Sequence, residues 1–208
     1  GVSYDYDYFT KANLFLAAPE VTGRVATNKF GSIKLVNSQS DKKSCGPDGV
    51  YNTEDDGMPS SLQEYVTLLA EIKNSGRSPI ILAGNSIDYG FFLADGLWAA
   101  LAGKEQFKTI YSLDSKGQKI VEVVTGYTNE DLFYNGSGIK RPTTEMIAIS
   151  EENGYRIYDM ASRYYALATL QLIYQEKWFL ESYLNNAQKT NVQAQYNFVN
   201  EDEAAILY

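Results

Sequence analysis

The clearest hydrophobic pattern in the chain predicts an amphipathic helix that begins near Ser61 and ends near Gly76. Apolar side chains recur there at helical spacing, at Leu62, Tyr65, Val66, Leu69 and Ile72. Ser61 precedes Glu64 by three residues, which is the spacing of a capping box, and Asn74 with Gly76 is typical of a helix end. Because one face of this helix is apolar, we expect it to pack against the rest of the fold.

A longer helix is predicted in the C-terminal half of the chain, from Tyr155 to about Ala187. This stretch contains no glycine or proline, and its apolar residues keep a helix-like spacing. Two helices joined at a kink fit the pattern equally well. Shorter helices are predicted over residues 9–18 and 88–102.

Alternating or short apolar runs predict the strands. They cover residues 24–37, 79–83, 107–113, 119–127, 131–134, 143–150 and the stretch Val192, Ala194, Tyr196, Phe198. Turn residues at 114–117 and 135–138 predict two hairpins. The mixture predicts an α+β fold: an antiparallel sheet, a long helix in the C-terminal half and a shorter amphipathic helix. At this length we expect one domain, 1–208, with an acidic loop at 38–57.

Composition narrows the possible functions. The chain has no histidine, which excludes histidine-dependent triads and histidine-ligated zinc, and its single Cys45 allows no internal disulfide. Its 18 basic and 26 acidic residues give a net charge of −8, so nucleic acid is not an expected partner. No apolar run is long enough to cross a bilayer. The chain begins with Gly1 instead of Met, as expected if an export signal has been removed.

The main candidate site is the glycine-punctuated loop at 46–57, with the sequence G-P-D-G-V-Y-N-T-E-D-D-G. Its oxygen-bearing side chains are those of Asp48, Asn52, Glu54, Asp55 and Asp56. Carboxylate and amide oxygens are the ligands that Ca²⁺ accepts, and like charges about 5 Å apart in water repel by roughly 0.8 kcal/mol per pair. If the loop is compact, this repulsion favours a bound cation. If the loop is open, it is a solvated acidic turn without a metal. It lacks the EF-hand pattern.

The string G-P-D-G-x-x-x-T-x-D-D over these dozen residues resembles the acidic calcium loop of exported bacterial proteins, including type II secretion pseudopilins and other type IV pilin-like subunits. The resemblance implies an exported, calcium-binding protein of a filament or assembly. Matching positions make Asp48, Glu54, Asp55 and Asp56 possible Ca²⁺ ligands, with Asn52 secondary. Two features of those proteins differ: their hydrophobic amino-terminal helix is absent here, and their loop comes later in the chain.

From these observations we expect a non-catalytic, calcium-binding structural subunit of a cell-surface filament or pilin-like apparatus. It would be extracellular, at the cell surface or in the periplasm, with protein subunits, including copies of itself, as partners. Two alternatives stay open. One is a carbohydrate-binding surface module that stacks sugars on exposed tyrosines or Trp98, given 17 tyrosines in the chain. The other is a carboxylate glycoside hydrolase, with Asp88 and Asp95, or Glu130 and Asp131, as the acid pair.

Overall fold

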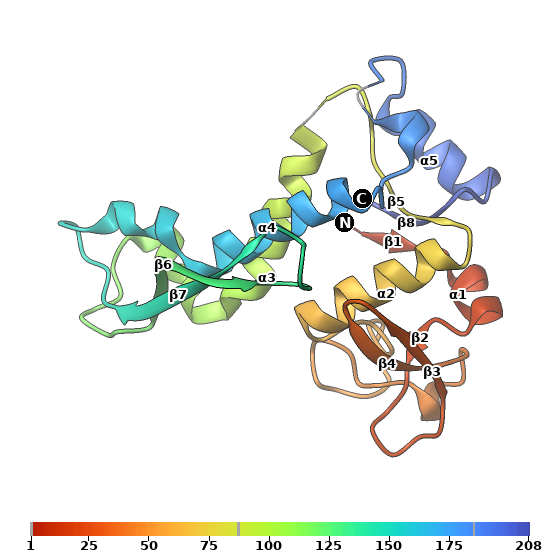
Figure 1. The fold of residues 1–208 in the computed structure, drawn as a ribbon, viewed down its shortest axis with the longest axis horizontal. Coiled ribbons are helices and arrows are strands. Elements are labelled where there is room, and N and C mark those ends of the chain that lie inside the picture. Colours follow the sequence, from red (N-terminus) through yellow and green to blue (C-terminus); the bar gives the residue numbers. More distant parts are fainter. Residues whose placement is uncertain (1, 87, 185) are drawn as a thin grey trace. The chain divides into compact units, whose positions relative to one another are not determined.

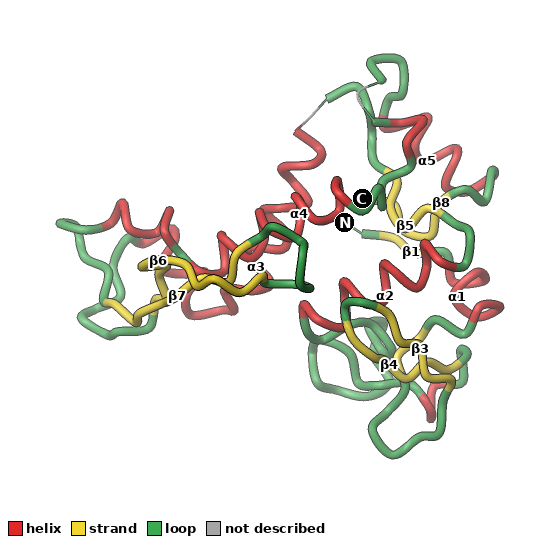
Figure 2. Tube along the Cα trace, viewed as in Figure 1, coloured by secondary structure: helices red, strands yellow, loops and turns green. Residues whose placement is uncertain are grey.

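A computed structural model of the chain describes residues 2–86, 88–184 and 186–208 and confirms the α+β class (Figures 1 and 2). The chain divides into two compact units. Unit 1 comprises Gly1–Ile87 and Glu176–Tyr208, and unit 2 comprises Asp88–Gln175. Unit 2 is therefore an insertion between two segments of unit 1. That the whole chain acts as one domain stays a prediction.

Unit 1 contains two small sheets. In the first, β8 (Ala204–Leu207) lies between β1 (Ser3–Tyr4), to which it is antiparallel, and β5 (Ser78–Ile81), to which it is parallel. The second sheet is antiparallel, with β4 (Gly31–Val36) between β2 (Phe15–Leu16) and β3 (Arg24–Asn28). The expected strand at 24–37 is thus a hairpin of two strands.

The helices of unit 1 are α1 (Tyr6–Ala12), α2 (Leu62–Asn74), α5 (Asn191–Asn200) and two short 3-10 helices, η1 (Ser40–Lys42) and η3 (Glu181–Tyr183). The predicted capping box of α2 is confirmed. The Ser61 hydroxyl accepts the Glu64 N–H at 3.2 Å, and the Glu64 carboxylate accepts the Ser61 N–H at 3.1 Å. The apolar face of α2 is buried and packs against both sheets, through contacts with β3, β4 and β5.

Unit 2 combines two helices with a hairpin. Its elements are α3 (Asp88–Ser112), β6 (Val121–Asp131), β7 (Lys140–Ile147), the 3-10 helix η2 (Gly154–Asp159) and α4 (Ala161–Gln175). The path of α3 breaks at Gly103, where φ is 67° and ψ is 171°. A buried cluster fills the centre of this unit, formed by Ala102, Val121, Val123, Ile149, Ile157 and Met160.

Three predicted strands are wrong. The segment 131–134 lies in the turn that follows β6, which ends at Asp131, and the other two segments are helical. Residues 107–113 fall largely within α3: Phe107 and Ile110, spaced by three, pack against the buried cluster, so the relevant period is helical. Residues 192–198 belong to α5. Thr190 and Gln193 form a capping box there, with the Gln193 side chain accepting the Thr190 N–H at 2.8 Å. A single hairpin, β6–β7, replaces the two expected ones.

Three predicted helices have other bounds. The helix expected at 88–102 is α3, which continues to Ser112. The helix expected at 155–187 is α4, which ends at Gln175 shortly before Lys177 adopts a left-handed φ of 54°. The helix expected at 9–18 is α1, which begins after its N-cap Asp5 and ends at the left-handed Asn13. The buried residues that follow α1 then pair with β4 as strand β2.

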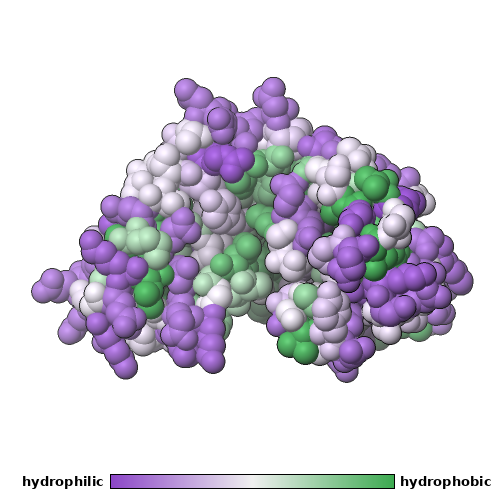
Figure 3. Space-filling model, turned by 90° about the horizontal axis from the view of Figure 1, so that it is seen from below, coloured by the Kyte–Doolittle hydropathy of each residue, from purple (hydrophilic) through white to green (hydrophobic). Residues whose placement is uncertain are grey.

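Within the three described segments, no helix combines the length and the apolar character needed to cross a membrane. The face of the molecule drawn in Figure 3 is mostly hydrophilic, with hydrophobic residues in scattered patches.

Candidate functional site

The acidic loop at 46–57 lies in unit 1 between η1 and α2, and backbone hydrogen bonds anchor both of its ends to β2. Leu16 donates its N–H to the carbonyl of Gly57 at 2.9 Å and accepts the N–H of Ser44 at 2.8 Å. Gly57 in turn donates to the Ser44 carbonyl at 2.8 Å. The two ends of the loop are therefore bonded to Leu16 and to each other, and the carboxylates between them lie in a closed turn.

Gly46 closes this turn by contact between backbones. Its φ is +63°, and a Cβ at this position would lie 2.2 Å from the carbonyl oxygen of Asp55. Only glycine combines this left-handed backbone with so short an approach. The contact brings the start of the loop against its acidic end.

Asp55 organises the centre of the loop. One carboxylate oxygen accepts the hydroxyl hydrogen of Thr53 at 2.7 Å, and the other accepts the backbone N–H of Asp48 at 3.0 Å. The Thr53 hydroxyl, with a smaller contribution from the Asp48 amide, lowers the pKa of the Asp55 carboxyl below its ordinary value. Asp55 is thus held as a carboxylate.

Asp56 is the most buried acid of the loop, with 2% of its surface exposed. Its carboxylate accepts the backbone N–H of Asn52 at 2.8 Å, for which Asn52 adopts a left-handed φ of 66°. In the part of the chain that the structure describes, no lysine or arginine forms an ion pair with the four acids of the loop, which are Asp48, Glu54, Asp55 and Asp56. A carboxylate that is buried without a counter-charge is less favourable than one that is paired with a cation.

The structure brings the backbone of the predicted ligand residues together more than their side chains. Asp48 and Asn52 donate their backbone N–H groups to Asp55 and Asp56, whereas Glu54 is exposed and, with Asp55, lines a neighbouring cavity. Among the described residues, no three acidic, histidine or cysteine side chains already converge as a set of metal ligands. The loop is closed, and the carboxylates of Asp48, Asp55 and Asp56 already accept hydrogen bonds from N–H and hydroxyl donors within it.

Thr53 is a central residue that the sequence reasoning did not select. Its hydroxyl donates to Asp55 and lies 3.5 Å from an oxygen of Asp56. The available signal was its position two residues before the acidic pair in the T-x-D-D string, where a hydroxyl readily bonds to a nearby carboxylate.

The cavity beside the loop has a volume of about 610 Å³ and is lined by Tyr4, Tyr6, Lys43 and Glu54, among others. Tyr4 belongs to an aromatic cluster and lies with its ring centroid 5.1 Å from that of Phe9. Burial, and then the neighbouring Tyr6 and Glu54, raise the pKa of the Tyr4 hydroxyl, so it stays protonated at neutral pH. The acidic loop therefore borders an aromatic surface.

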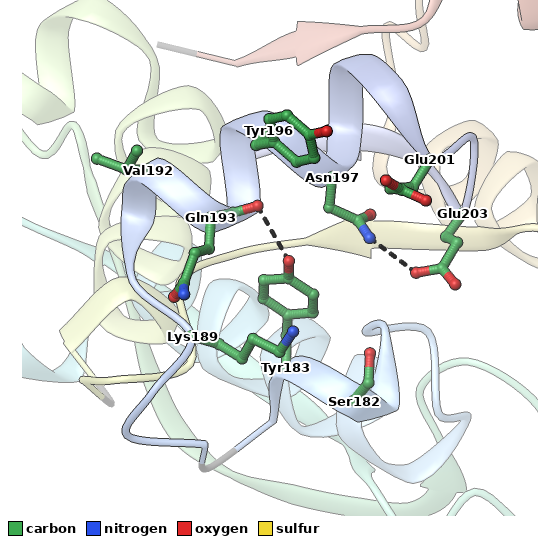
Figure 4. A pocket seen from close by; sticks show the side chains of 9 residues that line it. All are labelled: Ser182, Tyr183, Lys189, Val192, Gln193, Tyr196, Asn197, Glu201 and Glu203. Atoms are coloured by element: carbon green, nitrogen blue, oxygen red, sulfur yellow. Dashed lines mark hydrogen bonds between the residues drawn. The ribbon is translucent and has the colours of Figure 1, made fainter.

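A second cavity in unit 1, of about 600 Å³, lies between η3, α5 and the turn that leads into β8 (Figure 4). The Tyr183 hydroxyl donates to the Gln193 carbonyl at 3.0 Å, and the Asn197 amide donates to Glu203 at 2.8 Å. Figure 4 shows both bonds crossing the space between α5 and its neighbours. These polar groups connect α5 to the segments around it, which is a structural role.

In one of the two acid pairs considered for a hydrolase, Glu130 and Asp131, both carboxylates contact nearby basic side chains. Asp131 accepts the N–H groups of Gly136 and Gly138, at 2.8 and 3.2 Å, and pairs with Lys140 at 2.8 Å. Its carboxylate thereby shapes the turn between β6 and β7. Glu130 beside it is exposed and lies 3.6 Å from a guanidinium nitrogen of Arg141.

No family model, no curated protein and no solved structure matches this chain. The residues of the site are therefore the basis for inferring function.

Proposed function

We propose that this protein is a calcium-binding, non-catalytic structural subunit of an exported cell-surface assembly. Calcium binding is supported by the burial of the Asp56 carboxylate. Asp56 lies in a closed turn that contains three more acidic residues, and none of the described lysines or arginines forms an ion pair with it. A bound divalent cation would neutralise this charge. The location and the assembly role rest on the resemblance of the loop to those of pilin-like proteins.

Ca²⁺ suits this loop better than a smaller ion because it accepts six to eight oxygens in flexible geometry. The carboxylates of Asp48, Asp55 and Asp56 would hold it, together with carbonyl oxygens of the turn. The ion supplies positive charge and fixes the loop. To bind it, the loop would exchange some internal bonds, such as that from Thr53 to Asp55, for bonds to the ion.

Thermal unfolding of the full chain tests calcium binding. At a Ca²⁺ concentration about 100 times the Kd, binding adds about 2.7 kcal/mol, which corresponds to a rise in Tm of roughly 5 to 10 °C over the sample in EDTA. Mg²⁺ at the same concentration should give a much smaller rise. An unchanged Tm in millimolar Ca²⁺ would refute calcium binding.

Asp56→Asn separates a charge effect from a packing effect. Asparagine keeps an oxygen for the Asn52 N–H but removes the uncompensated charge, so Tm in EDTA should stay equal or rise while the Ca²⁺ response is lost. Glu151→Gln, at an exposed position in unit 2, changes the net charge equally and should keep the full response. A variant Asp56→Asn that is destabilised in EDTA yet still stabilised by Ca²⁺ would contradict the proposal.

Assembly is tested separately by sedimentation velocity over a range of protein concentrations, in Ca²⁺ and in EDTA. We expect larger species with Ca²⁺, and their loss in Asp56→Asn. If the protein stayed monomeric at all concentrations while Ca²⁺ still raised its Tm, calcium binding would be supported and the role as an assembly subunit would be refuted.

A further inference from the structure

Unit 2 contains a groove that is independent of the acidic loop. It has a volume of about 370 Å³ and lies between β6, η2 and α4. Three tyrosines line it, one from each element: Tyr127 from β6, Tyr158 from η2 and Tyr164 from α4. Cavities of this size hold small ligands or parts of larger ones.

A bulge in β6 sets the direction of Tyr127. Val121 and Val123 face the buried core, and strict alternation would place residue 127 on the same face. However, Val124 is opposite Thr144 while Gly126 is opposite Thr143, so the strand contains one extra residue. This shift reverses the alternation. Tyr127 consequently keeps 59% of its surface exposed.

The tyrosine rings are held in place by their neighbours. The rings of Tyr127 and Tyr164 have centroids 5.4 Å apart, and the Tyr164 hydroxyl donates to the Lys140 carbonyl at 2.5 Å. Tyr158 is 63% exposed, and the Arg163 guanidinium lies 5.7 Å from its ring centroid while donating to its carbonyl at 3.1 Å. The groove thus offers preoriented aromatic surface to solvent, which lowers the entropy cost of binding.

The groove also carries one positive and one negative side chain, Arg163 and Asp159. Asp159 accepts from Arg156 through one carboxylate oxygen, at 2.8 Å. A ligand that matches these groups must both donate and accept hydrogen bonds, must carry no net charge, and must present apolar surface to the rings. Sugar rings meet all three conditions, since their C–H faces stack on aromatic rings and their hydroxyls both donate and accept.

We propose that this groove binds a neutral carbohydrate through stacking on Tyr127 and Tyr158 and hydrogen bonds to Asp159 and Arg163. A proline-rich peptide, the other common ligand of aromatic grooves, offers carbonyl acceptors but no prolyl N–H, so its prolines could accept from Arg163 but could not donate to Asp159, whose donor stays Arg156. The carbohydrate site is a second function of the chain and does not depend on calcium.

The test is a titration of the full chain, in EDTA, with cellotetraose, maltotetraose, chitotetraose and, as the peptide probe, decaproline, followed by calorimetry and NMR. At least one tetrasaccharide should bind at millimolar concentration or below and shift the signals of residues around the groove. Tyr127→Ala and Tyr158→Ala should each weaken binding about three- to tenfold. The control Tyr111→Ala removes a tyrosine that is 76% exposed on α3 and should leave the affinity unchanged.

Three results would overturn the proposal. One is the absence of binding by all three sugars, and another is tighter binding of decaproline than of any sugar. The third is an affinity that is equal in wild type, Tyr127→Ala and Tyr158→Ala. Because Tyr158 is exposed, its variant should keep the wild-type Tm, so a loss of binding would report the groove and not unfolding.

Discussion

Gly46→Ala is the sharpest test of how the acidic loop closes, because Gly49 in the same loop provides a matched control. Both glycines have positive φ, +63° and +73°. Alanine in this conformation costs about 1 to 2 kcal/mol at either site. At position 49 a Cβ meets nothing within 4 Å, whereas at 46 it lies 2.2 Å from the oxygen and 2.7 Å from the carbonyl carbon of Asp55. Relief of that overlap adds about 1 to 3 kcal/mol.

Urea unfolding measures the difference between the two variants. Trp178 is buried in unit 1 and Trp98 lies in unit 2, so fluorescence in a Trp98→Phe background reports unit 1. The free energy of unfolding should fall by about 2 to 5 kcal/mol in Gly46→Ala and about 1 to 2 kcal/mol in Gly49→Ala. Equal losses would refute the close backbone approach. The same pair in Ca²⁺ should show a weakened response for Gly46→Ala alone, since that substitution displaces Asp55.

Two further predictions concern ion pairs and pH. Arg77, 13% exposed, binds Asp5 at 2.6 Å and Asp202 at 3.0 Å, and Asp202 is 77% exposed. In urea unfolding Arg77→Ala should cost about 2 to 4 kcal/mol and Asp202→Ala less than about 1, and equal losses would contradict this ranking. The Lys140 ammonium, followed by the Gly136 and Gly138 amides, lowers the pKa of Asp131. Its stabilisation of the β6–β7 turn is therefore present above the ordinary aspartate pKa and is lost as pH falls from that value through the lowered pKa of Asp131. The Gly136 amide NMR signal should report that loss in wild type and stay constant in Asp131→Asn.

Local signals in the sequence were sufficient to predict an element where helix propensity and tertiary packing favour the same structure. For α2, the capping box and the apolar spacing both indicate a helix, and its apolar face is buried as expected. The predictions at 107–113 and 192–198 were wrong because short apolar runs fit both the two-residue period of a strand and the 3.6-residue period of a helix. Thr190 with Gln193 was a readable capping box that would have identified α5.

The candidate site was predictable in composition but not in geometry. Spacing placed the acids in one loop, yet it carried no information about which acid would be buried. Burial of Asp56 and outward placement of Glu54 follow from the anchoring of the loop ends to β2, which depends on residues far away in the sequence. The tyrosine groove depends similarly on tertiary packing and on a bulge, which no local pattern revealed.

The central position of β8 in its sheet has a consequence for synthesis on the ribosome. Residues 204–207 are translated after every other described element, yet β1 and β5 both pair with them. Neither strand has β8 as its partner until residues 204–207 are translated, whereas unit 2 is contiguous and has all its residues earlier. We therefore expect unit 2 to acquire its structure during elongation, before the β1–β8–β5 sheet of unit 1, which cannot form until residues 204–207 have left the ribosome.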